Sequence, residues 1–113
     1  MNEGECKMKL WIDDVRHPPE SFIPSYVWVK SVNEAKTIIR ANKDRTYGPY
    51  KIELIDIDHD AGDWAFDGGD YIKLLDWMEM MNINIPIRIH SMNPVGRENM
   101  RAIIQRNGWT EVF

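Results

Sequence analysis

The sequence predicts an α/β domain with a parallel β-sheet, and two observations support this prediction. Short apolar runs alternate along the chain with stretches whose apolar residues recur at helical spacing, which is typical of parallel strands joined by helices. Polar side chains follow three of the apolar runs, and ligands bind such sheets beyond the carboxyl ends of the strands. The 113 residues, 43% of them hydrophobic, suit a single domain over residues 1–113.

Five apolar runs are expected to form the strands. The first run breaks at Asp13 and the third ends in Asp58, so both of these strands end in acid. Between the first two runs lies VRHPPESFIPSY, whose three prolines remove backbone donors and disfavour a helix, so we expect an extended loop there. The expected strands cover residues 8–12, 26–29, 51–58, 85–91 and 109–113.

Three stretches with helical periodicity follow the later strands. Ser31 and Glu34 have the spacing of a capping box at the start of the first helix. Asp70 is expected to cap the second helix, and Asn93 the third, where Pro94 suits the first helical position. The expected helices cover residues 31–42, 71–82 and 93–108.

Composition narrows the classes of partner. The net charge of −4, from 14 basic and 18 acidic residues, gives no broad attraction to nucleic acid or to anionic membranes. The single cysteine, Cys6, excludes an intramolecular disulfide, and no stretch approaches the length of a membrane span. We therefore expect a cytoplasmic protein that does not contact a membrane, and the oligomeric state stays open.

Two strand ends carry three carboxylates. If the strands that end at Asp13 and Asp58 are neighbours, Asp13, Asp14 and Asp58 converge at one edge of the sheet, where their like charges need a counter-ion. Hard divalent cations such as Mg²⁺ prefer oxygen ligands of this kind. The alternative is structural, because an Asp-Asp pair also terminates strands and caps turns.

His59 lies between Asp58 and Asp60 in the segment IDIDHDAG. A histidine between carboxylates tends to keep its proton and can act as a general acid or orient a phosphate. The alternative is a loop histidine that is hydrogen-bonded to backbone.

The segment IHSMNPVGREN predicts a phosphate site at the start of the third helix. After the cap at Asn93, the amides of Val95 and Gly96 are expected to be free, and such a helix start attracts anions. Ser91 at the strand end and Arg97 one turn into the helix add hydroxyl and guanidinium donors. Ser91 and Asn93 alternatively serve only to end the strand and cap the helix.

His90 and Ser91 are adjacent, so a regular strand points them to opposite faces, and we favour Ser91 as the one that faces the ligand. The acidic segment 61–70 is also ambiguous. Trp64 and Phe66 there could close over the cleft and stack on a base, or they could pin the loop into a surface groove, which we favour.

These elements resemble the receiver domain of two-component response regulators. The resemblance implies that Asp13 and Asp14 match the acidic pair that binds Mg²⁺, Asp58 the phosphorylated aspartate and Ser91 the phosphate-contacting hydroxyl. The chain departs from that pattern in two places: a proline-rich loop replaces the first helix, and no lysine follows Lys73.

A closer resemblance, over nearly the whole chain, is to the cyclic-phosphate processing receiver domain family. LWIDDVRHPP, IDHDAG and IHSMNPVGRENM look like its motifs, although Ala61 stands where leucine is usual. The resemblance implies a three-layer, receiver-like (flavodoxin-like) fold with a five-stranded parallel sheet in the order 2-1-3-4-5, and a role in processing cyclic phosphates.

The leading hypothesis is the metal-assisted hydrolysis of a cyclic phosphate on a nucleotide or an RNA end. The metal would be Mg²⁺ or Mn²⁺. Its alternatives are a receiver-like module that binds a phosphate-bearing ligand or a protein without catalysis, and true phosphorylation of Asp58. The residues assigned to the leading hypothesis are Asp58, His59 and His90 for catalysis, Asp13, Asp14 and Asp58 for the metal, and Arg16, Ser91, Asn93 and Arg97 for the phosphate.

Overall fold

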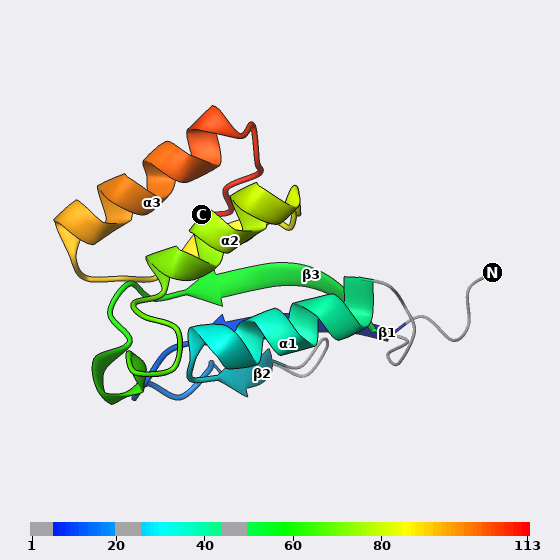
Figure 1. Cartoon of the computed structure of the whole chain (residues 1–113), viewed down its shortest axis with the longest axis horizontal. Helices are drawn as coiled ribbons and strands as arrows, with labels where there is room; N and C mark the ends of the chain where they lie inside the picture. Colours follow the sequence, from blue (N-terminus) through cyan, green and yellow to red (C-terminus); the bar gives the residue numbers. More distant parts are fainter. Residues whose placement is uncertain (1–5, 20–25, 44–49) are drawn as a thin grey trace.

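The computed structural model describes residues 6–19, 26–43 and 50–113, and these residues form an α/β domain (Figure 1). Its strands are β1 (Cys6–Ile12), β2 (Tyr26–Val29), β3 (Tyr50–Ile57) and β4 (Ile87–Ile89). Its helices are α1 (Val32–Lys43), α2 (Ile72–Met81) and α3 (Pro94–Arg106), with a short 3₁₀ turn, η1 (Gly62–Trp64), before α2. Within the described residues, no helix has the length and apolar character needed to cross a membrane.

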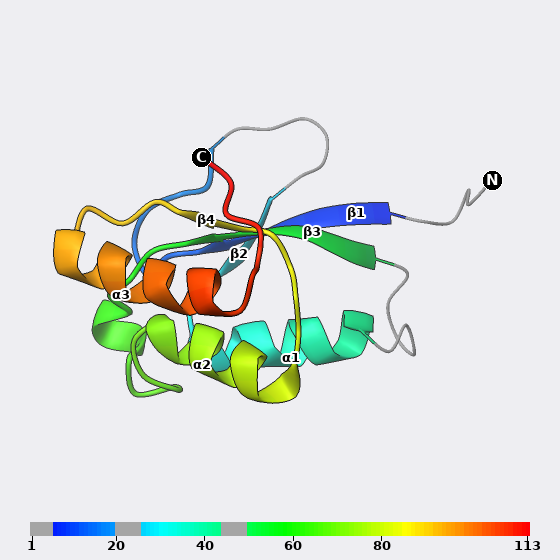
Figure 2. The same ribbon diagram turned by 90° about the horizontal axis from the view of Figure 1, so that it is seen from above.

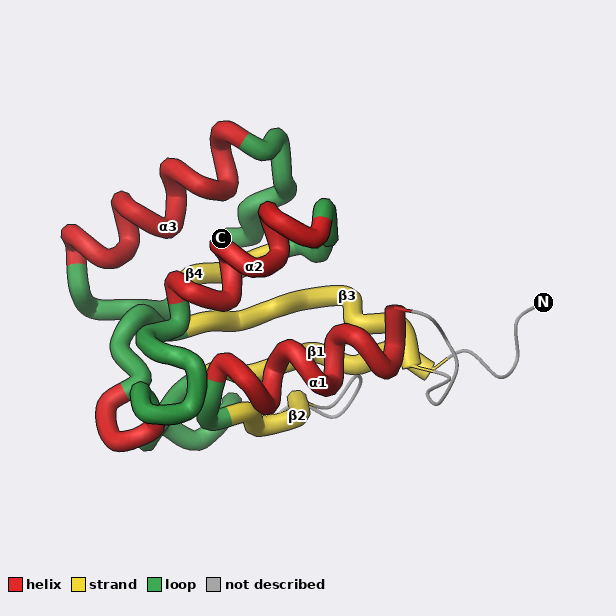
Figure 3. Tube along the Cα trace, in the orientation of Figure 1, coloured by secondary structure: helices red, strands yellow, loops and turns green. Residues whose placement is uncertain are grey.

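The four strands form one parallel sheet in the order β2-β1-β3-β4, which confirms the predicted order for these four. β1 is central, and Trp11 pairs with Trp28 of β2 on one side and with Asp56 of β3 on the other. The loops that follow the strands therefore gather at one end of the sheet, as Figure 3 shows.

The predicted fifth strand is not confirmed. Residues 109–113 pass beside β4, but they form only an isolated bridge between Ile87 and Glu111, with hydrogen bonds from Ile87 N to Thr110 O and from Val112 N to Ile87 O. β4 offers only three residues for pairing. Arg101 Nη2 of α3 donates to Glu111 Oε2 at 2.7 Å, so the helix as well as the sheet fixes this segment.

The three-layer arrangement is not observed either, because all three described helices lie on one face of the sheet (Figure 2). Alternation along the strands explains this. Leu10, Ile12, Ile55 and Ile57 are fully buried and belong to the hydrophobic core on the helix side. Trp11 and Asp56, which lie between them, point to the other face, where both contact His90.

That other face is approached by the segment after β1. Residues 13–19 contain no helix, as the sequence predicts, whereas residues 20–25 of the predicted proline-rich loop lie outside the described part of the chain. Trp11 Nε1 donates to Arg16 O at 2.8 Å, and the ring of His17 lies 4.6 Å from that of Trp28. Two indoles of the sheet thus anchor this segment.

Two of the three predicted helix caps, Ser31 and Asn93, are correct. Ser31 Oγ accepts from Glu34 N at 3.1 Å, and Glu34 accepts from Lys30 N rather than from the cap residue itself. The prediction for Asp70 is wrong, since α2 begins after Tyr71 without a side-chain cap. The Asp70 carboxylate accepts instead from Ala61 N at 3.0 Å, which ties down the loop that follows β3.

Candidate functional site

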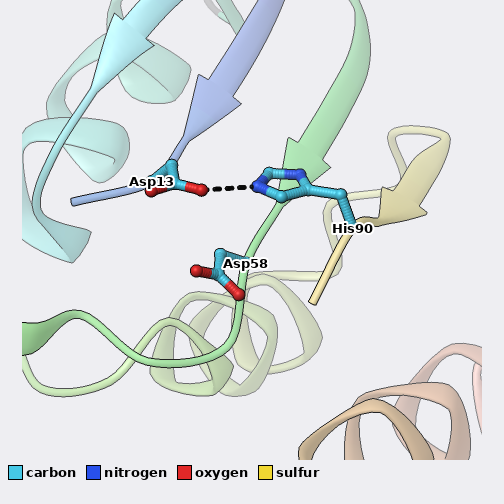
Figure 4. Close-up of side chains that lie close together, drawn as sticks. All are labelled: Asp13, Asp58 and His90. Carbon is cyan, nitrogen blue, oxygen red and sulfur yellow. Dashed lines mark hydrogen bonds and ion pairs between the residues drawn. The ribbon is translucent and has the colours of Figure 1, made fainter. Parts of the chain in front are cut away.

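Two buried carboxylates lie side by side at the carboxyl edge of the sheet. Asp13 follows β1 and Asp58 follows β3, with exposed fractions of 0% and 8%. The backbone brings them together, because Asp58 N donates to Ile12 O at 2.9 Å. One ligand atom from each carboxylate and one from His90 lie within 4.8 Å of one another (Figure 4). The two acidic strand ends therefore meet, as the sequence predicts.

Asp14 completes the acidic cluster. Burial raises its pKa, and the charges of Asp13 and Asp58 raise it further, which is the repulsion expected of like charges at one site. Gly62 allows a close approach to this carboxylate: its φ is +55°, and a Cβ atom there would collide with Asp14 Oδ2. The loop before α2 can therefore close against the cluster only with glycine at this position.

Asp13 is held as an anion despite its burial. Burial alone would raise its pKa, but hydrogen bonds from the amides of Arg16 and Val15 and from His90 bring the pKa below its usual value. The amide bonds are 2.8 Å for Arg16 N and 3.0 Å for Val15 N, both to Asp13 Oδ1. Asp13 thus ends the strand, and its Oδ1 caps the turn that follows. For this oxygen, the structural role that the sequence left open as an alternative is confirmed.

The imidazole of His90 lies between two carboxylates. Its Nδ1 is 2.8 Å from Asp56 Oδ1. Its Nε2 is 2.9 Å from Asp13 Oδ2, the contact drawn as a dashed line in Figure 4. The side chain extends from the end of β4 across β3 to β1, and Trp11 covers one face of the ring. Only 10% of the side chain is exposed. His90 therefore belongs to the cluster, on the face opposite the helices.

The sequence interpretation missed Asp56. This residue is fully buried in β3, and besides His90 its carboxylate contacts the hydroxyl of Tyr26 at 3.0 Å and the guanidinium of Arg88 at 3.6 Å. Burial, followed by the charge of Asp56, raises the pKa of Tyr26. A signal was available in the alternation IDID, which places Asp56 on the same face as Asp58.

His59 lies at a separate point of the edge, beside the start of α3. Its Nδ1 is 2.8 Å from Asp60 Oδ1, and its side chain is 16% exposed. A Cβ atom on Gly96 would lie 2.5 Å from His59 Cγ, so the glycine lets the helix pack directly against the imidazole ring. The alternative expected from the sequence, a ring hydrogen-bonded to backbone, is wrong, because the ring contacts the side chain of Asp60.

The start of α3 offers fewer free donors than predicted. Asn93 is the cap, as predicted, and its side chain accepts from Gly96 N at 3.0 Å, so the prediction of a free Gly96 amide is wrong. Ser91 is 4% exposed, and its hydroxyl oxygen accepts from Asn93 N at 3.0 Å. Among the described residues, none accepts from the amide of Val95, so this amide is still available to an anion.

The two arginines assigned to phosphate stand at different distances from the acidic cluster. Arg16 lies within it, with Nε 4.0 Å from Asp13 Oδ2 and Nη1 3.5 Å from His90 O, and its side chain is 47% exposed. Arg97 is an exposed residue in the first turns of α3. Arg16 is therefore placed to neutralise the cluster, and Arg97 borders the turn that contains Val95.

The donor atoms suit a hard divalent cation. Asp58 accepts from His59 N through Oδ1 at 2.8 Å, and among the described residues no donor contacts its other oxygen. Carboxylate oxygens with one imidazole are a set that Mg²⁺ or Mn²⁺ accepts, with Mn²⁺ the more tolerant of nitrogen. Asp13, Asp58 and His90 offer the ligand atoms that lie close together, and Asp14, which the sequence also assigns to the metal, borders them.

The strand order, the joining helices and the acidic ends of β1 and β3 together define a receiver-like domain. The sequence model of the cyclic-phosphate processing receiver domain matches residues 8–106, and the chain belongs to this family. No curated protein and no solved structure shows a significant match to the chain.

Proposed function

We propose that the chain hydrolyses a cyclic phosphate on a nucleotide or an RNA end with the help of a divalent cation. The observation that carries this proposal is the convergence of Asp13 and Asp58 with His90. Asp14 lies beside them, and burial together with the charges of Asp13 and Asp58 raises its pKa. Such a cluster is stable when a cation neutralises it. The family, which is named for the processing of cyclic phosphates, supplies the substrate class.

The three aspartates would hold the ion, which is Mg²⁺ or Mn²⁺ in this proposal. When bound, it supplies Lewis-acid polarisation of a phosphoryl oxygen. Arg16, 4.0 Å from Asp13 Oδ2, adds positive charge on the solvent side of the cluster. On the other side, Val95 N–H and Arg97 border the place where the remaining phosphate oxygens would lie.

His59 is the group that we assign to proton transfer. Asp60 accepts from its Nδ1, which leaves the lone pair of Nε2 free to take a proton from the attacking water. The water oxygen forms a bond to phosphorus, one of the two ester P–O bonds of the ring breaks, and His59 then returns a proton to the leaving alkoxide oxygen. His90, with both ring nitrogens engaged, is a positioning residue for Asp13 in this scheme.

The test is an assay of the full chain against 2′,3′-cyclic mononucleotides and RNA with a 2′,3′-cyclic phosphate end, with Mg²⁺ or Mn²⁺ or with chelator. We expect turnover that requires the metal and that falls at least a hundredfold in Asp58→Asn. Asp63→Asn, which changes an exposed carboxylate on η1, is the matched control and should retain activity. Absence of turnover across the whole panel would overturn the proposal.

A binding module without catalysis is the second candidate, and one observation favours it. Ser91 Oγ and Asn93 Oδ1 accept bonds from backbone amides, and both ring nitrogens of His90 contact carboxylates, so fewer groups are left for chemistry. This candidate predicts that a cyclic nucleotide binds, by calorimetry, and is recovered unchanged after prolonged incubation with metal. Recovery of the ring-opened monophosphate would reject it.

A further inference from the structure

A pocket lies beside the acidic cluster and has no part in the chemistry described above. It has a volume of about 400 Å³ and opens at the carboxyl end of β2, between the start of α1 and η1. This volume is within the range of about 300–1,000 Å³ that small-molecule sites occupy. Its lining residues are Trp28, Lys30, Ser31, Glu34, Trp64 and Asp67.

Two indoles face the same point in this pocket. The ammonium group of Lys30 lies 4.6 Å from the ring centroid of Trp28 and 5.8 Å from that of Trp64. A cation contacts aromatic rings through their faces, so both indoles turn a face toward the pocket. Trp64 is 36% exposed, so part of its ring is open to a ligand in the pocket.

The loop that carries Trp64 is anchored, but not by its aromatic residues. Asp67 accepts from Ser31 Oγ at 2.6 Å and from Asn33 Nδ2 at 3.1 Å, and these bonds lower its pKa. Phe66 is 81% exposed. The interpretation that the aromatics pin the loop is therefore wrong: Asp67 pins it, and the indole of Trp64 is left facing the pocket.

The polar groups of the pocket suit a guanine base. Glu34 Oε1 accepts from Lys30 N, and among the described residues no donor contacts its second oxygen. Guanine presents donors at N1 and N2 and acceptors at O6 and N7, which a carboxylate and a lysine complement. Single-stranded bases are typically recognised in this way, by stacking on aromatics and hydrogen bonds to their edges.

The pocket is also joined to the acidic cluster. Trp28 Nε1 donates to Asp13 O at 2.8 Å, so one wall of the pocket is bonded to the backbone of a proposed metal ligand. We infer that this pocket binds the guanine base of the nucleotide whose phosphate reaches the acidic cluster, with Trp28 and Trp64 as stacking partners and Glu34 as the acceptor. Only the placement of the phosphate at the acidic cluster rests on the proposed function; binding of the base in the pocket does not.

The test uses guanosine, which has no phosphate, so that binding to the pocket is measured without the acidic cluster. Guanosine titrated into the full chain should shift the indole N–H signals of Trp28 and Trp64 in a ¹H–¹⁵N NMR spectrum. Trp64→Ala should weaken binding by about fivefold or more, whereas Trp64→Phe keeps a stacking ring and should bind nearly as the wild type does. Phe113→Ala, which removes an exposed aromatic outside the pocket, is the control.

Glu34→Gln tests base choice, because it should reduce the preference for guanosine over uridine. The inference is overturned if guanosine shifts neither indole signal, or if Phe113→Ala weakens binding as much as Trp64→Ala does. The two proposals also fail separately. Hydrolysis of cyclic guanosine phosphate without guanosine binding rejects only the pocket, and guanosine binding without hydrolysis of any cyclic phosphate rejects only the proposed reaction.

Discussion

The imidazole of His90 and the indole of Trp11 lie face to face, with ring centroids 3.9 Å apart and ring planes 1° apart. His90 directly follows β4 and Trp11 lies in β1, with β3 between these strands, so the imidazole bridges the middle of the sheet above Asp56. The stacked rings cover one face of each other, which fixes the plane of the imidazole. Two carboxylates and one aromatic face thus hold His90 in one position.

Removal of this imidazole should destabilise the fold. In His90→Ala, Asp13 and Asp56 remain buried and lose the cation or donor between them, and breaking one partner of a buried charge pair costs about 3–5 kcal/mol. We expect a loss near the lower end of that range in urea unfolding, because Arg16 N and Tyr26 still contact the two carboxylates.

Two variants serve as controls for His90→Ala. His90→Gln retains one donor and should lose less stability than the alanine variant. Arg97→Ala changes an exposed side chain on α3 and should stay within about 0.5 kcal/mol of the wild type. A wild-type unfolding free energy for His90→Ala would show that the histidine is not part of the structural cluster.

A divalent cation should stabilise the protein through the three aspartates. Binding to the folded chain alone raises the unfolding free energy by about 2.7 kcal/mol at a hundredfold excess over the dissociation constant. Thermal unfolding with Mg²⁺ or Mn²⁺ should therefore show a higher midpoint that chelator reverses. Asp58→Asn should lose the effect and Asp63→Asn should keep it, and an equal rise in both variants would place the ion elsewhere.

Asp14 should make the metal-free protein less stable as pH rises. Its pKa is raised in the folded chain, so its contribution is fully present below the unfolded value of 3.8 and is lost as pH rises through the folded value. Asp14→Asn lacks this loss. The variant should therefore gain stability relative to the wild type across that acidic range, as measured by urea unfolding at a series of pH values. Excess Mg²⁺ should shrink the difference, and a difference independent of pH would contradict the repulsion.

Sequence patterns predicted most of the fold because they depend on local physics. Alternating apolar runs, the capping residues Ser31 and Asn93, and the acidic ends of two strands all appear where expected. One error concerns Asp70, which its position alone predicts to be a helix cap. Nothing in the local sequence distinguishes a helix cap from a carboxylate that accepts from a loop amide such as Ala61 N.

The other omissions required the sheet to be assembled first. Trp11, Asp56 and Arg88 fall in one row across β1, β3 and β4, and only the register of three strands brings them together. Period-two alternation does show, strand by strand, that polar or aromatic residues share one face. Combining the alternation of all four strands predicts a cluster of polar and aromatic residues on one face of the sheet. This is the face opposite the helices that the structure describes.

The ion pair between α2 and α3 should confer stability that acid removes. Arg106 donates to both Glu79 oxygens at 2.7 Å, and with Asn107 it lowers the pKa of Glu79 to about 2. A lowered pKa means stability that is present above the unfolded value of 4.5 and is lost as pH falls toward 2. The free-energy difference between wild type and Glu79→Gln should thus be constant from pH 5 to 7 and shrink below pH 4.5. Asp63→Asn should show no such trend.

Arg97 separates a role in phosphate binding from a role in the fold. Its exposed side chain makes no hydrogen bond or ion pair with the residues that the structure describes, so Arg97→Ala should leave the unfolding free energy unchanged. If Arg97 contacts the phosphate, the same variant should reduce kcat/KM on a 2′,3′-cyclic nucleotide by about 10- to 100-fold, the loss of one charge-assisted contact. Arg97→Lys should recover part of it, because the positive charge remains while the two-pronged geometry is lost. Equal kcat/KM in wild type and Arg97→Ala would move the phosphate away from the start of α3 and toward Arg16.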